Sequence, residues 1–147
     1  MGICSSRKNL RNCTVQNTPW LTFEGVKCNC KVLSIYDADT VTIAIPFKGR
    51  IYKLKCRLSG IDAAEKRSKN PTEKQIALRG TERLKNLILN RVIWINCGKF
   101  DKYGRLLGIL YQSKKDCKSG LRKQSINQLL VNEKYAYIYD GGKKRSW

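Results

Sequence analysis

Three runs rich in β-branched residues follow one another early in the chain, and a helix start signal comes directly after them. The runs cover residues 31–36, 40–47 and 51–61. In the second run, Val41, Ile43 and Ile45 share one face, which is the pattern of a strand that is buried on one side. Asn70 and Pro71 then fit the N-cap and the first position of a helix. This succession predicts neighbouring strands with a helix packed against them.

The remaining pattern extends this arrangement without any repeat. Further strands are expected over residues 91–97, 106–111 and 135–139, and Ser125 opens a second capping box. The order β-β-β-α-β-β-α suits a small barrel with packed helices, an α+β fold. A chain of 147 residues is long enough for one such domain. We expect a basic arm over residues 1–27, whose Pro19–Phe23 stretch packs on the domain, then the domain over 28–140 and a basic tail over 141–147.

The composition of the chain limits which partners and which kinds of catalytic site it can have. Thirty Lys and Arg against eleven Asp and Glu give a formal charge of +19, so nucleic acid and anionic lipid are the expected partners. The chain has no His, which excludes His-based triads, Cys–His nucleophiles and imidazole metal sites. The seven Cys are interpreted as reduced thiols, with Cys56 and Cys97 in the core.

The few acidic residues gather at the ends of predicted strands. Asp37 and Asp39 lie between the first two runs, and Asp62 and Glu65 follow the third. If the barrel brings these turns to one rim, their oxygen ligands favour Ca²⁺ or Mg²⁺. Asp in such a position also commonly stabilises a turn, and the spacing alone leaves both interpretations open for Asp37 and Asp39.

Two arginines stand near these carboxylates in the sequence. Arg57 lies five residues before Asp62, so in an ideal strand it points to the opposite side unless Gly60 introduces a bulge. Arg105 follows a glycine turn at the start of a predicted strand. Guanidinium groups suit a phosphate whose charge grows during substitution, although each arginine viewed alone is typical of a solvated surface charge.

Three motifs in order resemble the staphylococcal nuclease (thermonuclease) family. They are residues 37–41 (DADTV), 57–65 (RLSGIDAAE) and 101–105 (DKYGR), and the likeness runs from about Cys30 to Tyr139. The resemblance implies a five-stranded OB-type β-barrel with two to three packed helices. It also implies a calcium-dependent phosphodiesterase that cuts DNA and RNA and leaves 3′-phosphate products.

The resemblance also assigns roles to residues of this chain. It implies metal ligation by Asp39, Asp62 and the Ala63 carbonyl, a general base at Glu65, and a phosphate clamp of Arg57 and Arg105. It places Lys102 and Tyr103 at a terminal phosphate, and Tyr137 and Tyr139 against nucleotide bases. The chain departs from the family at Ala63-Ala64, where Pro or Thr-Pro is frequent, so the loop before Glu65 is expected to be less stiff.

The N-terminal residues fit a lipidation signal. Residues 1–6 (MGICSS) match the N-myristoylation pattern at Gly2, and Cys4 offers an adjacent palmitoylation site. Arg7, Lys8 and Arg11 add attraction to anionic headgroups. We therefore expect attachment to the cytoplasmic face of a membrane, with the plasma membrane as the first expectation.

Two other functions remain open on the sequence. One is a catalytically silent OB-fold module that binds single-stranded nucleic acid, and the other is a basic scaffold at a membrane surface. A pure binder has no reason to concentrate carboxylates next to a polyanion, and a scaffold leaves the carboxylate–arginine set unexplained. The sequence therefore favours the enzyme.

Overall fold

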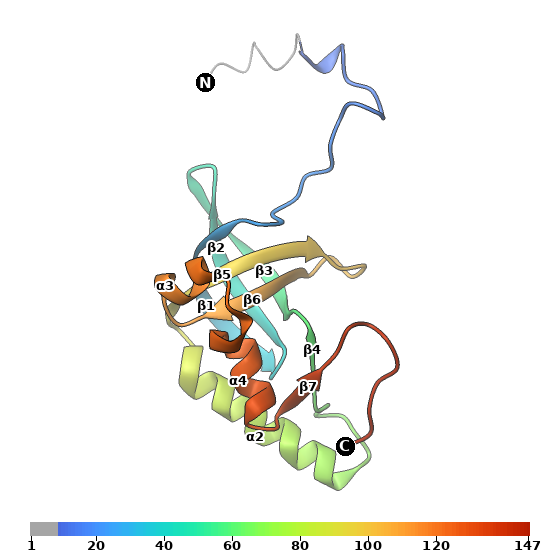
Figure 1. The fold of residues 1–147 in the computed structure, drawn as a ribbon, viewed down its shortest axis with the longest axis vertical. Coiled ribbons are helices and arrows are strands. Elements are labelled where there is room, and N and C mark those ends of the chain that lie inside the picture. The colour runs from blue at the N-terminus through green and yellow to red at the C-terminus, as the bar shows by residue number, and fades with distance from the viewer. Residues whose placement is uncertain (1–8) are drawn as a thin grey trace.

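Five strands close into a barrel in the computed structural model, which describes residues 9–147 (Figure 1). They are β1 (Lys27–Asp37), β2 (Thr40–Phe47), β3 (Arg50–Leu58), β5 (Val92–Phe100) and β6 (Leu106–Tyr111). Their order around the barrel is β1-β2-β3-β6-β5, and every pair is antiparallel except β3 and β6. The predicted α+β fold with a five-stranded OB-type barrel is confirmed.

The third predicted strand is two strands in the structure. β3 ends at Leu58, and β4 (Ile61–Ala63) leaves the barrel to pair with β7 (Ala136–Ile138) in a separate two-stranded sheet. Gly60 lies between them with φ of 75°, a left-handed conformation that breaks the strand and that glycine adopts without a Cβ clash. The expectation of one continuous strand over residues 51–61 was therefore wrong.

Between residues 71 and 132 the structure has three α-helices and a 3₁₀ turn. They are α2 (Pro71–Ile88), α3 (Lys114–Ser119), η1 (Arg122–Gln124) and α4 (Ile126–Asn132). The predicted cap of α2 is confirmed, since Asn70 Oδ1 accepts from the Thr72 N–H at 2.9 Å. Ser125 caps α4 in the same way. The sequence analysis missed α3 because six residues are too few to show helical periodicity.

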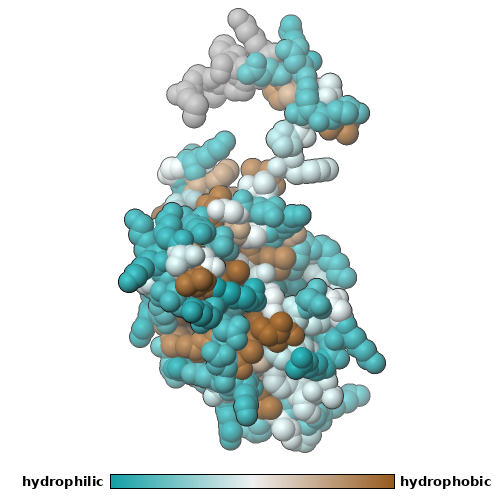
Figure 2. All heavy atoms as spheres, viewed as in Figure 1, coloured by the Kyte–Doolittle hydropathy of each residue, from teal (hydrophilic) through white to brown (hydrophobic). Residues whose placement is uncertain are grey.

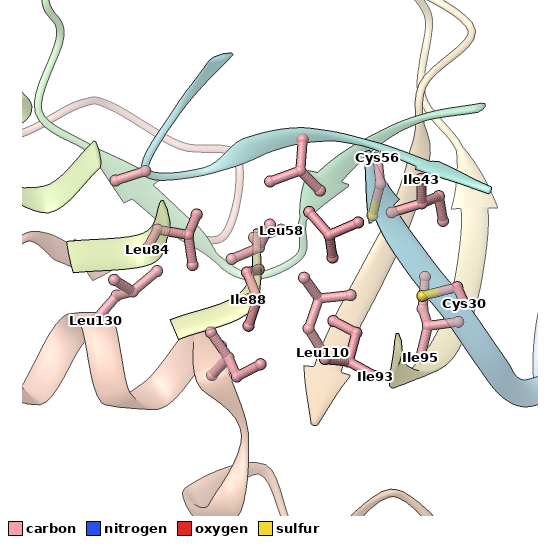
Figure 3. Close-up of a cluster of buried hydrophobic side chains, with 14 of the residues drawn as sticks. Cys30, Ile43, Cys56, Leu58, Leu84, Ile88, Ile93, Ile95, Leu110 and Leu130 are labelled. Atoms are coloured by element: carbon pink, nitrogen blue, oxygen red, sulfur yellow. The ribbon is translucent and has the colours of Figure 1, made fainter. Parts of the chain in front are cut away.

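The core fills the barrel and the space between the barrel and the helices. Figure 3 shows Leu84 and Ile88 of α2 and Leu130 of α4 converging on Leu58 at the end of β3. All four side chains are fully buried, and each contributes about 1.5–3 kcal/mol by leaving water. Cys56 and Cys97 are buried as expected. This packing holds α2 and α4 firmly at the end of the barrel where the acidic residues lie.

Residues 9–26 form an arm that extends from the barrel (Figure 1). Phe23 is its anchor, because the Phe23 ring contacts the rings of Phe47 and Phe100 with centroids 5.2 and 5.8 Å apart. Trp20 and Leu21 are 94% and 73% exposed, so the packing expected for residues 19–23 holds for Phe23 only. The rest of the visible surface is mostly hydrophilic with scattered hydrophobic patches (Figure 2).

The predicted lipidation sites, Gly2 and Cys4, lie outside the described residues. Between residues 9 and 147, no helix combines the length and the apolar character that crossing a bilayer requires.

Candidate active site

A cleft of about 1430 Å³ opens where β2 begins and β3 ends. The β5–β6 turn and the segment after β7 form its other walls. Most of the predicted site residues line it: Asp39, Arg57, Asp62, Ala63, Glu65, Lys102, Tyr103, Arg105 and Tyr139. The fold therefore brings together residues from four separated parts of the sequence.

Arg57 is the centre of the charged wall. Its Nη1 lies 3.0 Å from Asp39 Oδ2, and its Nη2 lies 3.0 Å from Asp62 Oδ1. The left-handed turn at Gly60 interrupts the strand between Arg57 and Asp62 and so allows the two side chains to meet, as the predicted irregularity required. Arg122 supports the turn from behind, where its Nη2 donates to the Ser59 carbonyl at 2.6 Å. The Arg57 side chain is only 14% exposed, so this charge bridges two buried carboxylates.

The two aspartates of the β1–β2 turn have different surroundings. Asp39 reaches across to β4, and its Oδ2 accepts from the Ala63 N–H at 2.8 Å. Asp37 stays within the turn and accepts from the Asp39 N–H at 3.2 Å. Burial, and then repulsion from Asp39, raises the pKa of Asp37 to about 7. The turn interpretation therefore describes Asp37, whereas Asp39 faces the other carboxylates of the cleft.

Tyr137 holds Asp62 in place. Its hydroxyl donates to Asp62 Oδ2 at 2.9 Å and accepts from the Arg145 N–H at 3.0 Å. Burial, together with the bond to Asp62, raises the pKa of Tyr137. Tyr137 does not line the cleft, while Tyr139 does and donates to the Gly142 carbonyl at 2.8 Å. The predicted base-stacking roles of both tyrosines stay predictions.

Glu65 lies at the rim, with its side chain 61% exposed. Its backbone N–H donates to Glu73 Oε1 at 3.2 Å, and the Ser68 hydroxyl bonds to the other oxygen of Glu73. The first turn of α2 therefore holds the loop that carries Glu65, where Ala63-Ala64 replaces a stiffer sequence. This contact of Glu73 was not predicted, because it joins the helix to a loop eight residues away in the sequence.

The β5–β6 turn supplies another wall of the cleft. Arg105 Nε lies 2.7 Å from Asp101 Oδ2, and the Arg105 N–H donates to Asp101 Oδ1 at 2.9 Å. Although burial opposes it, these bonds hold the pKa of Asp101 below its usual range. The exposed Tyr103 ring lies between two cations, with Lys102 Nζ at 5.2 Å and Arg105 Cζ at 5.3 Å from its centroid. This wall presents positive charge and an aromatic face to the cleft.

The carboxylates of the cleft provide the type of ligand atom that a hard cation prefers. Asp39, Asp62 and Glu65 offer oxygen ligands only, which is the preference of Ca²⁺. Within residues 9–147, however, the structure shows no group of three acidic or Cys side chains arranged around one metal position. Arg57 and Lys144 balance the acidic charge instead, with Lys144 Nζ 3.2 Å from Glu65 Oε1 and 3.5 Å from Asp62 Oδ1.

Comparisons with known proteins agree with this geometry. The chain is 26% identical over 120 residues to a micrococcal nuclease of Shigella flexneri, an alignment that covers 82% of this chain. It spans about three fifths (60%) of the length of that curated relative. The profile of the family described as "Staphylococcal nuclease homologue" matches residues 55–146, which include Arg57, Asp62, Glu65 and Arg105. Because this match covers well over half of the sequence, the chain belongs to the staphylococcal nuclease family.

Proposed function

We propose that the protein is a calcium-dependent nuclease that hydrolyses phosphodiester bonds of DNA and RNA and leaves 3′-phosphate products. The observation that carries the proposal is the convergence of Asp39, Asp62 and Glu65 with Arg57 and Arg105 in one cleft. A chain with a net charge of +19 attracts polyanions without any carboxylates, so a buried acidic group here needs a chemical reason. Family membership supports the same chemistry.

The cation site of this proposal uses Asp39, Asp62 and the carbonyl of Ala63. When bound there, Ca²⁺ supplies polarisation of a phosphoryl oxygen. Tyr137 fixes one oxygen of Asp62, and the Ala63 N–H fixes one oxygen of Asp39, so both carboxylates are oriented before a ligand arrives. Such orientation lowers the reorganisation that binding requires.

The chemical step of this proposal uses three side chains of the cleft. Of Asp39, Asp62 and Glu65, Glu65 is the one with an exposed side chain, so it can meet a water molecule and take its proton as the water attacks phosphorus. The bond from phosphorus to the 5′ oxygen breaks in this step, and the 5′ oxygen takes up a proton from water and leaves as a hydroxyl. Arg57 at the end of β3 and Arg105 directly before the paired strand β6 both line the cleft, and their guanidinium groups stabilise the charge that grows on the phosphoryl oxygens. Lys102 and Tyr103 then lie beside Arg105 to contact a second phosphate.

Cleavage assays test this proposal directly. Purified protein is incubated with single-stranded DNA and with RNA, first with Ca²⁺ and then with a chelator. We expect cleavage with Ca²⁺ only, and a loss of about 10³-fold in Glu65→Gln, since the base contributes about 10²–10⁴-fold. Glu24→Gln removes the same charge from the exposed arm and is the matched control. Chelator-resistant cleavage contradicts the mechanism, and binding without any cleavage favours the silent OB-fold module instead.

We further propose that acylation at Gly2 and Cys4 attaches the protein to the cytoplasmic face of a membrane, in the first instance the plasma membrane. Phe23 fixes the arm beside Phe47, at the β2–β3 hairpin tip. Trp20 and Leu21 are exposed there, as is suitable for a bilayer interface. The opposite end of the same hairpin, where Thr40 pairs with Arg57, carries the cleft, so attachment leaves the cleft open to substrate.

Expression in eukaryotic cells tests the attachment. Gly2→Ala should move the protein from the membrane fraction to the soluble fraction, because myristoylation requires an N-terminal glycine. Asn9→Ala lies outside the signal and should leave the distribution unchanged. Mass spectrometry of the N-terminal peptide checks the acyl groups themselves. Membrane association that persists in Gly2→Ala contradicts this part of the proposal.

A further inference from the structure

Residues 143–147, here called the strap, fold back over the cleft. Figure 1 shows the chain looping out after β7 and returning to the start of α2. The reversal occurs at Gly141, which adopts φ of 98°, and the Gly142 N–H closes the turn on Asp140 Oδ1 at 3.0 Å. The strap ends against Asn70, whose Nδ2 donates to the Trp147 main-chain oxygen at 3.4 Å. A segment expected from the sequence only as a basic tail therefore contacts the site.

The first contact of the strap is made by Lys144, which places a positive charge between Asp62 and Glu65. Its Nζ lies 3.2 Å from Glu65 Oε1 and 3.5 Å from Asp62 Oδ1. Lys144 differs from Arg57, the other cation on Asp62, in one respect. Its side chain is 54% exposed against 14% for Arg57, so Lys144 is the cation that can leave without opening the fold.

The second contact covers Tyr137. The Trp147 ring packs on the Tyr137 ring with centroids 5.2 Å apart, and Arg145 Cζ lies 5.5 Å from the same ring. The Arg145 N–H also donates to the Tyr137 hydroxyl. An indole and a guanidinium therefore occupy an aromatic face next to the acidic group. A nucleobase, which stacks on aromatic rings in the same way, would compete with Trp147 for that face.

We propose that the strap is an autoinhibitory cover that must leave before a divalent cation and a nucleotide bind. Lys144 places its positive charge against Asp62, a ligand of the proposed cation site, while Trp147 shields Tyr137. This inference rests on the proposed nuclease function, since it identifies what the strap excludes. The docked strap therefore lowers both cation binding and the access of a nucleobase to Tyr137.

Calcium titration of the full chain by calorimetry tests the strap. We expect Lys144→Ala to bind Ca²⁺ about five- to tenfold more tightly than the unaltered protein, which is the size of effect expected for removing a half-exposed competing charge. Lys143→Ala removes the same charge from the neighbouring position, for which the structure shows no ion pair or side-chain hydrogen bond, and is the matched control. Circular dichroism and thermal melting check that both variants fold.

Displacement is measured in the unaltered protein by ¹⁵N-indole NMR. The Trp147 signal, assigned with Trp147→Phe, should move on Ca²⁺ addition towards its position in Lys144→Ala. An unchanged Ca²⁺ affinity in Lys144→Ala, or an equal gain in Lys143→Ala, overturns the strap proposal even when the unaltered protein cleaves DNA. A tighter Ca²⁺ site and a moving Trp147 signal without any cleavage support the strap and count against the nuclease alone.

Discussion

The two ends of the β2–β3 hairpin carry opposite kinds of surface. At the site end, where Thr40 pairs with Arg57, charged groups are buried and paired. At the hairpin end, where Phe47 pairs with Arg50, hydrophobic groups such as Ile51 are exposed beside lysines. Seven residue steps separate the two ends, which is about 23 Å of strand. The contrast indicates that chemistry and attachment are divided between the ends of one rigid hairpin.

The largest expected effect is on the free energy of unfolding, when one arginine is removed at each end of the hairpin. Arg57→Ala leaves Asp39 and Asp62 buried without their shared partner, so the free energy of unfolding should fall by about 3–5 kcal/mol. Arg50→Ala removes an exposed charge and should change it by less than about 0.5 kcal/mol. Urea unfolding in calcium-free buffer measures both values. Similar losses in the two variants contradict the division between the ends.

The glycines that turn the chain at each end offer a closer comparison. Gly60 and Gly49 have φ of 75° and 77°, so alanine is strained by about 1 kcal/mol at either position. A Cβ on Gly49 meets nothing within 4 Å, whereas a Cβ on Gly60 overlaps the Arg122 guanidinium. Gly60→Ala should therefore cost about 2 kcal/mol, because the Arg122 guanidinium has to leave the Ser59 carbonyl, and Gly49→Ala about 1 kcal/mol. Equal thermal melting shifts would show that the Gly60 turn is not tightly packed.

Vesicle binding probes the hairpin end. The double variant Trp20→Ser/Leu21→Ser should reduce partition of the unacylated protein onto phosphatidylserine vesicles about tenfold, since both exposed side chains bury apolar area at an interface. Leu78→Ser removes an exposed leucine from α2, away from the hairpin end, and serves as the control. Sedimentation with vesicles measures both. Equal losses for the two variants would mean that the arm does not define the contact surface.

The smallest expected effect concerns two thiols near the hairpin end. A hydrogen bond with Cys97 lowers the pKa of Cys28 to about 7 from 9.0. Its reactive thiolate is therefore half formed near pH 7, and alkylation should rise between pH 6 and 8 and then level off. Cys13, exposed on the arm, is the reference thiol. Iodoacetamide labelling followed by peptide mass spectrometry compares the two, and identical pH profiles would contradict the lowered pKa.

Local patterns predicted much of the fold. Alternation located β2, the signals at Asn70 and Ser125 located α2 and α4, and the three motifs led to the barrel. Short features were not predicted, because α3 and the break at Gly60 involve too few residues to produce a periodic signal in the sequence.

The sequence predicted which residues belong to the cleft, but it did not predict most of the contacts between them. The charged residues of the cleft were named from the sequence, yet the bridge formed by Arg57 depends on how the turn at Gly60 folds. The contact of Lys144 with Asp62 and Glu65 joins residues about 80 positions apart, and no local pattern encodes it. Tyr137 was expected to face the substrate, and its bond to Asp62 became visible only once β4 and β7 were paired.

The hydrogen bond between Glu73 and the backbone of Glu65 affects how the Glu65 loop responds to a rise in temperature. Helix ends fray at temperatures at which the rest of a fold is intact, and Glu73 belongs to the first turn of α2. When that turn opens, the loop of the proposed base loses its tether while the five-stranded barrel still stands. We therefore expect warming to release the Glu65 loop at a lower temperature than the one that melts the barrel.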